Sequence, residues 1–291
     1  MVKRAVDPLL LAALLGLGVL LTATPPAPAA TIVDPSERWR TAVNVGWIGY
    51  DQNRQPIVCG GGSGGLIGDV AVVVTNAHVS DYDKEDLKDC PDAYLAVGYS
   101  YGVQDIRFVW FPATERAADA TLDIAVLDVN LQAQPWFEGG TKDLAPLLAG
   151  DWPVLNLAQS EPHIGDQIGA YGFPAIGGYS VTFTSGYVAG WSEDLAGNSS
   201  GAMKLDLNVS HGSSGSLLLN QDGDVVGLVA IIGIPTQQGD LVDCAQLADT
   251  NLDGEIDDRD TCVSVGGFIN SAVSWEQLRA FLMAHPAKSQ E

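Results

Sequence analysis

The sequence predicts an all-β protein, and three observations support this prediction. The chain has 291 residues with 33 glycines and 15 prolines, a composition that favours many tight turns. Short runs rich in valine, isoleucine and leucine lie between these turns. Helical periodicity appears only near the C-terminal end. With 46% hydrophobic residues, the chain is apolar and long enough to bury one large core or two smaller ones.

Each strand is expected where a run of β-branched residues meets turn signals. A first set is expected at residues 42–50, 70–79, 93–101, 106–111 and 123–129. The glycine run at residues 60–65 is expected to form a corner between the first two of these strands. A second set is expected from residue 167 onwards, at residues 181–191, 203–208, 217–219, 225–232 and finally near 263–269.

One amphipathic helix is expected, over residues 274–285. Ser274 and Gln277 have the spacing of a capping box, in which each side chain binds the backbone N–H of the other residue. Four apolar side chains then fall on one face of the helix: Trp275, Leu278, Phe281 and Leu282. We therefore expect this helix to have a packing role.

The first 29 residues have the pattern of an export signal. Lys3 and Arg4 precede an apolar stretch at residues 9–21, and residues 27–29 read A-P-A, a cleavage pattern. We expect cleavage after Ala29 and a secreted protein, extracellular or periplasmic, with no stable membrane insertion afterwards. Cleavage after Ala30 and retention as an anchor stay open, although the apolar stretch is short for a membrane-spanning helix.

The charge of the chain argues against two classes of partner. The formal net charge is −22 at pH 7. Nucleic acids and anionic membrane surfaces are both negatively charged and repel such a chain, so neither is expected to bind it. The same acidity suits a secreted protein but identifies no substrate.

Four cysteines are expected to form disulfides, because an exported chain matures in oxidising surroundings. Three connectivities are open, and we favour the pairs that are local in sequence: Cys59–Cys90 and Cys244–Cys262. The sequence contains no C-x-x-C pair, which disfavours a zinc site.

The stretch at residues 211–217, H-G-S-S-G-S-L, carries the strongest chemical signal. Gly212 permits a tight turn that aims its own N–H group and that of Ser214 at a single point. A developing oxyanion would lie at that point if the Ser214 hydroxyl attacked a carbonyl group. Because glycine–serine clusters are usually plain loops and a serine hydroxyl is a weak nucleophile, the chain must also supply a base.

His78 and Asp123 are the candidate base and the group that orients it. His78 ends a β-branched run, which would hold its imidazole rigidly. Asp123 begins an apolar stretch, where a carboxylate is costly to bury unless an N–H group such as that of an imidazole pairs with it. Of the other histidines, His163 lies in a polar turn, His285 lies at the helix end, and His211 is expected to rim the pocket beside Ser214.

Three segments resemble the signature blocks of trypsin-like serine proteases, and in particular those of the HtrA/Deg group and of bacterial glutamyl-endopeptidase-like enzymes. The segments are T-N-A-H-V at 75–79, D-I-A-V-L at 123–127 and G-S-S-G-S at 212–216. The resemblance implies a chymotrypsin-like fold with two six-stranded antiparallel β-barrels and a C-terminal helix. It implies one peptidase domain over residues 30–286, with barrel one at about 40–135, barrel two at about 150–272 and the helix at about 274–285. Trypsin has an aspartate where this chain has Ser213, so trypsin-type zymogen activation is not expected.

The resemblance further implies a serine endopeptidase that acts on peptide or protein substrates. Ser214 would be the nucleophile, His78 the general base, and Asp123 the group that fixes the His78 tautomer. The N–H groups of Gly212 and Ser214 would bind the oxyanion, and catalysis would need no cofactor.

The substrate side of the site is expected to be apolar and to accept small or medium uncharged side chains. Its walls are expected from Asn208, His211, Val229, Ala230 and Ile231, and the substrate would pair as an added strand near residues 228–231. Two other interpretations stay open: a catalytically inactive trypsin-like binding protein, and a calcium-binding surface protein.

Residues 249–260, D-T-N-L-D-G-E-I-D-D-R-D, have the spacing of a calcium-binding loop. Oxygen ligands stand at the first, third and fifth positions, a glycine at the sixth and an apolar residue at the eighth. The expected ligands are Asp249, Asn251, Asp253, Glu255 through its carbonyl group, Asp257 and Asp260. The loop resembles EF-hand and dockerin-type loops, and Ca²⁺ is expected to have a structural role.

Overall fold

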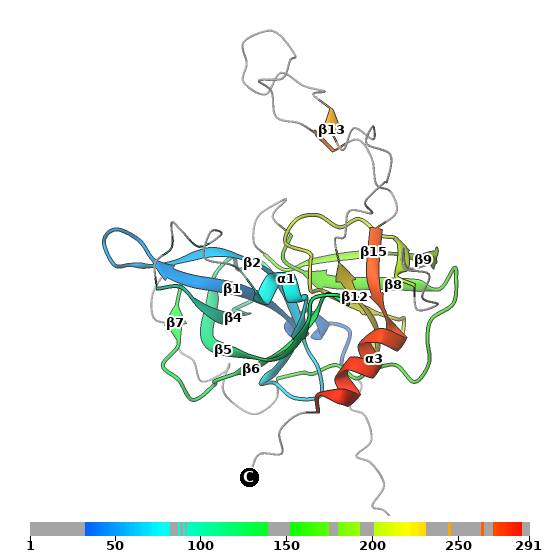
Figure 1. Cartoon of the computed structure of the whole chain (residues 1–291), viewed down its shortest axis with the longest axis horizontal. Helices are drawn as coiled ribbons and strands as arrows, with labels where there is room; N and C mark the ends of the chain where they lie inside the picture. Colours follow the sequence, from blue (N-terminus) through cyan, green and yellow to red (C-terminus); the bar gives the residue numbers. More distant parts are fainter. Residues whose placement is uncertain are drawn as a thin grey trace, which may run out of the picture. The chain divides into compact units, whose positions relative to one another are not determined.

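A computed structural model describes residues 33–81, 87, 90, 92–138, 152–174, 180–192, 201–230, 244–245, 263–264 and 270–286 (Figure 1). Every described residue belongs to one compact unit, Ile32–Glu291. The expected export signal at 1–29 and the expected calcium loop at 249–260 lie outside the described residues. No helix among the described residues is long and apolar enough to cross a membrane.

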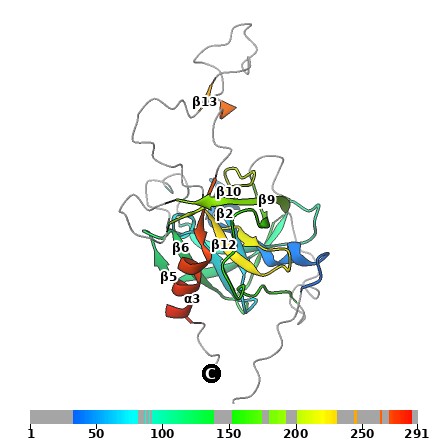
Figure 2. The same ribbon diagram turned by 90° about the vertical axis from the view of Figure 1, so that its right-hand side faces the viewer.

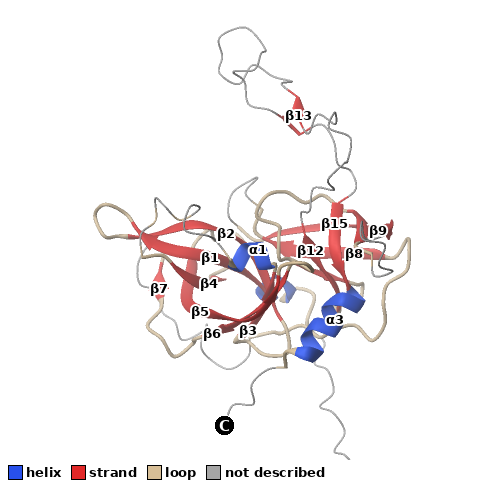
Figure 3. Ribbon diagram, in the orientation of Figure 1, coloured by secondary structure: helices blue, strands red, loops and turns tan. Residues whose placement is uncertain are grey.

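The first barrel is a closed ring of antiparallel strands, as the resemblance implies (Figures 1 and 3). Its six strands are β1 (Ala42–Tyr50), β2 (Pro56–Leu66), β3 (Val72–Thr75), β4 (Tyr94–Ser100), β5 (Phe108–Asp119) and β6 (Ile124–Val129). They pair in the order β4-β1-β2-β3-β6-β5, and pairing of β4 with β5 closes the ring. A two-residue strand, β7 (Trp136–Phe137), extends the sheet beyond β5.

Branched aliphatic side chains fill this barrel, which is why β-branched runs predicted its strands. Val43, Val73 and Leu127 are fully buried in one cluster, and each such side chain contributes about 1.5–3 kcal/mol when it is removed from water. Tyr99 brings a hydroxyl into the same cluster, and this group donates a hydrogen bond of 2.8 Å to the Val70 carbonyl oxygen. Burial raises the pKa of Tyr99 well above its usual range, so the phenol stays neutral.

The prediction of a corner at residues 60–65 is wrong, because these glycines lie inside the long strand β2. The strand pairs with β1 from Tyr50↔Pro56 to Ala42↔Gly65, with one irregularity between Trp47 and Ile48. Glycine is needed here because the neighbouring side chains leave no space for a Cβ atom, and not because the chain turns. A Cβ atom on Gly64 would lie only 2.8 Å from side-chain carbons of both Val45 and Val73.

The second barrel is also closed and six-stranded. Its strands are β8 (Gln167–Gly172), β9 (Thr182–Trp191), β10 (Met203–Asp206), β11 (Leu217–Leu219), β12 (Val225–Ala230) and β15 (Asn270–Ser274). They pair in the order β10-β15-β12-β11-β8-β9, and the barrel closes on itself. Its core holds Ile168, Met203, Leu205, Leu218 and Val229, all at most 2% exposed.

The last barrel strand lies later in the chain than predicted. The segment Val263–Ser264 forms β14, which pairs with β13 (Cys244–Ala245) in a separate two-stranded sheet. The barrel strand is β15, whose Ala272 pairs with β10 on one side and with β12 on the other. A strand of small residues fits between two neighbours, and its sequence has little apolar signal of its own.

The C-terminal helix, α3 (Trp275–Ala284), is confirmed together with its capping box. The Ser274 hydroxyl accepts a hydrogen bond from the Gln277 N–H, and the Gln277 side chain accepts one from the Ser274 N–H. Leu278 and Phe281 are buried in a cluster with side chains of both barrels, and Figure 2 shows the position of α3 itself. The Trp275 indole donates a hydrogen bond of 2.9 Å to the Ala158 carbonyl oxygen.

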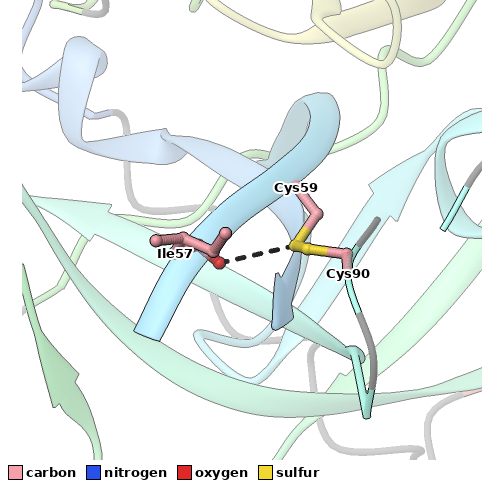
Figure 4. The surroundings of a disulfide bond; sticks show 3 residues. All are labelled: Ile57, Cys59 and Cys90. Atoms are coloured by element: carbon pink, nitrogen blue, oxygen red, sulfur yellow. Dashed lines mark hydrogen bonds between the residues drawn. A yellow bond between two sulfur atoms is a disulfide. The ribbon is translucent and has the colours of Figure 1, made fainter. Parts of the chain in front are cut away.

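One of the two expected disulfides, Cys59–Cys90, is present (Figure 4). It joins β2 to the segment after β3, with the two Cα atoms 6.1 Å apart. The Cys59 sulfur also lies 3.7 Å from the Ile57 carbonyl oxygen, as the dashed line shows. The expected pair Cys244–Cys262 involves side chains outside the described part of the chain.

Candidate active site

His78 lies on a short helix, α1 (Ala77–Ser80), and not at the end of a strand as expected. The strand β3 stops at Thr75, and the chain turns at once into this helix. Ala77 and Val79 are buried, whereas about half of the His78 side chain is exposed. The buried neighbours anchor the helix and leave one edge of the imidazole open to a substrate.

Asp123 holds the other edge of this imidazole. Its carboxylate oxygens lie 2.9 and 3.0 Å from Nδ1 of His78, and one of them also accepts a hydrogen bond of 3.1 Å from the His78 backbone N–H. Asp123 is only 8% exposed, so this pairing offsets the cost of burying the carboxylate. Because Nδ1 donates to the carboxylate, the lone pair of Nε2 is left free to accept a proton.

Asn76 fixes the backbone of Asp123, a role that the sequence reasoning missed. Asp123 has a φ of 56°, a left-handed conformation that non-glycine residues seldom adopt. The side-chain amide of Asn76 donates a hydrogen bond of 2.8 Å to the Asp123 carbonyl oxygen. Asn76 is fully buried, so this contact is shielded from competing water. The only signal in the sequence was an amide side chain within the T-N-A-H-V block, two residues before His78.

The turn that carries Ser214 contains two glycines in the left-handed region, Gly212 at φ 90° and Gly215 at φ 87°. The intervening Ser213 donates its N–H to the Ser210 carbonyl oxygen at 2.9 Å. Neither the Gly212 N–H nor the Ser214 N–H donates a hydrogen bond to another described residue. The turn therefore leaves the two predicted oxyanion donors available.

Ser63 of β2 ties this turn to the first barrel, and the sequence reasoning missed it as well. Its N–H donates to the Ser214 carbonyl oxygen at 2.7 Å, and its hydroxyl donates to the Gly212 carbonyl oxygen at 2.6 Å. The same hydroxyl accepts a bond of 2.9 Å from the Phe173 N–H. The Ser63 carbonyl oxygen in turn accepts the hydroxyl of Thr75 at 2.7 Å.

Gly62 shows how closely the Ser214 turn and the His78 helix approach each other. A Cβ atom on Gly62 would lie 2.9 Å from the Ser214 carbonyl oxygen and 2.9 Å from a methyl group of Val79. The described residues include no hydrogen bond between the Ser214 hydroxyl and the His78 ring. Such a bond is often long before a substrate binds.

Two of the five predicted substrate-binding residues line one cavity of about 430 Å³. These are Asn208 and Val229, joined there by Ser213, Ser216 and Phe183. None of the described residues that line this cavity is charged. The cavity lies entirely within the second barrel.

The other three predicted residues lie elsewhere. His211 lines a second, larger cavity. Ala230 is fully buried and lines neither of these two cavities, and Ile231 lies outside the described residues.

The expected strand addition is also wrong for Leu228 and Val229, because both edges of β12 are occupied there. Leu228 pairs with Leu217 of β11 and with Val273 of β15. Val229 pairs with β15 on one side, and on the other it exchanges backbone hydrogen bonds with the Ser214 turn. An incoming peptide finds no free backbone groups at these residues.

Two closed six-stranded antiparallel barrels, with a histidine–aspartate pair on one and a glycine-flanked serine on the other, define a chymotrypsin-like fold. Residues 62–228 match the family model of the trypsin-like peptidase domain. The chain therefore belongs to the family of trypsin-like peptidase domains. This result confirms the resemblance drawn from the three sequence blocks.

Curated relatives agree with this family. The chain is 28% identical over 181 residues to "Serine protease HTRA2, mitochondrial" of Drosophila persimilis, which covers 60% of this chain and 34% of the relative. It is 26% identical over 166 residues to "Serine protease HTR4" of Bos taurus, which covers 57% of this chain and 28% of the relative. The chain thus spans about one third of the length of the relatives it matches.

We expect Asn76→Ala to weaken both the fold and the reactivity of the site. The variant removes the hydrogen bond that holds Asp123 in its left-handed conformation, so the unfolding free energy should fall by about 1–3 kcal/mol. Urea unfolding of a Ser214→Ala background measures this loss. The rate at which a fluorophosphonate labels Ser214, per folded molecule, should fall as well.

Asn130→Ala is the matched control, because the side chain of exposed Asn130 accepts a turn hydrogen bond from the Gln132 N–H and makes no other hydrogen bond to a described residue. Its unfolding free energy should change by about 0.5 kcal/mol or less, with an unchanged labelling rate. Equal behaviour of the two variants would contradict the role given to Asn76.

Proposed function

We propose that this chain is a secreted serine endopeptidase that hydrolyses peptide bonds through an acyl-enzyme. One arrangement carries the proposal: the buried Asp123 carboxylate binds the backbone N–H and Nδ1 of His78, and Ser63 ties the Ser214 turn to the same barrel. The pairing would orient a base, and the tie holds the Ser214 turn against the barrel that carries this base. Membership of the trypsin-like peptidase family supports this assignment.

The proposed reaction uses each group in turn. The Ser214 hydroxyl attacks the substrate carbonyl while Nε2 of His78 takes its proton, and Asp123 stabilises the resulting imidazolium. The N–H groups of Gly212 and Ser214 bind the oxyanion that forms. His78 then gives its proton to the leaving amine, and water releases the acyl group by the same steps in reverse order.

The cavity of about 430 Å³ supports an uncharged side chain on the acyl side of the scissile bond. Its lining offers hydroxyl and amide groups beside apolar ones, and no described lining residue can pair with lysine, arginine or glutamate. A charged side chain would lose its hydration there without a counter-charge. We therefore propose a preference for small or medium uncharged residues.

The nucleophile and the base should each be indispensable. Ser214→Ala and His78→Ala should lower peptide hydrolysis by on the order of 10⁴-fold or more, because groups that act as one unit fail together. Circular dichroism should show that both variants remain folded. A fluorophosphonate should label the wild-type protein at Ser214 alone, and mass spectrometry identifies the labelled residue.

Ser213→Ala distinguishes the two neighbouring serines, since labelling should stay at Ser214 in this variant. Activity that survives in Ser214→Ala but not in Ser213→Ala would show that the nucleophile is misassigned. A folded wild-type protein that neither reacts with the probe nor cleaves any peptide would instead be an inactive binding protein.

Export and calcium binding are further parts of the proposal, and both rest on the sequence. The basic, apolar and A-x-A segments of residues 1–29 support export. The donor set of residues 249–260 supports Ca²⁺, a hard cation that prefers oxygen ligands. The four aspartates among the expected ligands repel one another, and a bound Ca²⁺ would cancel that repulsion. The ion would have no part in catalysis.

Calcium should therefore stabilise the folded protein. In Ser214→Ala protein, which cannot digest itself, Ca²⁺ at about 100 times its Kd should raise the melting temperature by roughly 5–10 °C relative to chelator. The double variant Asp249→Asn/Asp253→Asn should lose this increase, whereas Asp222→Asn, an acidic residue outside the loop, should keep it. Identical melting curves with no heat of binding in calorimetry would show that the loop binds no calcium.

A further inference from the structure

A cavity of about 760 Å³ extends from the Ser214 turn over the first barrel, and the function proposed above leaves it unused. We call it the barrel-one groove. Its lining includes Gly212, Gly62, Ile57, Ile106, Trp110 and Trp136. Gly212 is also a predicted oxyanion donor, so the groove is continuous with the point where the scissile carbonyl would lie.

The position of the base decides which part of a substrate the groove would hold. His78 must reach the leaving amine to protonate it, and His78 belongs to the first barrel. The chain that follows the scissile bond therefore leaves past the first barrel, where the groove lies. The cavity assigned to the acyl side lies in the second barrel and shares no lining residue with the groove.

The strand β2 can hold an extended chain in the groove through its backbone. It pairs with β1 from Pro56 to Gly65, except at Cys59, but it pairs with β3 only at Gly65 and Leu66. No described strand pairs with the other edge from Ile57 to Gly62. A peptide that passes Gly212 could add to this edge by backbone hydrogen bonds, a common mode of peptide binding.

The walls of the groove are apolar and rigid. Trp136 stacks on Trp110 with ring centroids 6.3 Å apart, and Trp110 is itself buried. Ile57, Val58 and Ile106 expose 36%, 42% and 58% of their surface and all line the groove. A group of exposed aliphatic side chains beside a reactive centre marks a binding surface.

Glu138 gives the groove its charge. It is the one acidic residue among the described lining residues, which include no lysine or arginine. Its carboxylate accepts a hydrogen bond of 3.3 Å from the Trp110 indole N–H, which holds it at the groove. An aspartate or glutamate of a substrate would be repelled there.

We propose that Ile57, Ile106 and Trp136 of the barrel-one groove select a large apolar side chain in the substrate segment that follows the scissile bond. This inference rests on the proposed peptidase function and deepens it, because it assigns sequence preference on the side of the scissile bond that departs first.

A peptide library randomised at the first three residues after the scissile bond tests the inference. Wild-type protein should cleave peptides with phenylalanine, tryptophan, leucine or isoleucine at one of these positions preferentially, and peptides with aspartate or glutamate there poorly. In a second peptide, glycine replaces the preferred apolar residue. The ratio of kcat/KM for the best peptide to kcat/KM for this glycine peptide then measures the selectivity for the apolar side chain. This ratio does not depend on the concentration of active enzyme.

Ile106→Ser should lower this ratio by roughly five- to tenfold, since it removes an apolar contact from the groove. Val103→Ser is the matched control, because Val103 is 52% exposed on the same connection between β4 and β5 but does not line the groove. The control should keep the wild-type ratio.

The outcomes separate this inference from the proposed function. A wild-type protein that cleaves peptides with no preference on the leaving side would overturn the inference and leave the peptidase function standing. An equal kcat/KM ratio in Ile106→Ser and in wild type would also overturn the inference without affecting the peptidase function. A folded protein that cleaves no peptide and does not react with a fluorophosphonate would overturn both.

Discussion

The two hydrogen bonds from Ser63 to the Ser214 turn are the contact on which the candidate site depends. The proposed base and its orienting carboxylate come from the first barrel, whereas the proposed nucleophile and oxyanion donors come from the second. Ser63 binds the carbonyl groups of Ser214 and Gly212, and its own carbonyl group accepts the Thr75 hydroxyl, three residues before His78. Each bond adds only about 1 kcal/mol of net stability. Together they determine where the two barrels place their proposed reactive groups.

Around this contact the chain tolerates features that stability alone would not select. Asp123 is a buried carboxylate in a left-handed conformation, which costs of order 1–3 kcal/mol. The N–H groups of His78 and the amide of Asn76 offset that cost, and the result is an imidazole held in one tautomer. Gly62 of β2 also keeps the site together, because any side chain at this position would push the Ser214 turn away from the His78 helix. Strain that is compensated locally is typical of a reactive centre.

The sequence predicted those features that depend on local pattern or on the identity of single reactive residues. Runs of valine and isoleucine located most strands, and Ser274 with Gln277 located the helix start. Features that depend on packing between distant segments were missed. The glycines at 60–65 resemble a corner, yet crowding inside the barrel makes them part of a strand. Ser63, Asn76 and the stacked pair of Trp110 and Trp136 acquire their roles only when the barrels close, and no local spacing reveals them.

The central claim is that His78, oriented by Asp123, acts as the base for Ser214. The pH dependence of covalent labelling tests it most directly, because labelling by a fluorophosphonate needs the nucleophile and the base but no peptide substrate. The account predicts that the labelling rate of folded wild-type protein falls steadily as the pH is lowered from about 8 to about 5, the range in which an imidazole gains its proton. A labelling rate that stays constant across this range in protein that remains folded would contradict the assignment of His78 as the base.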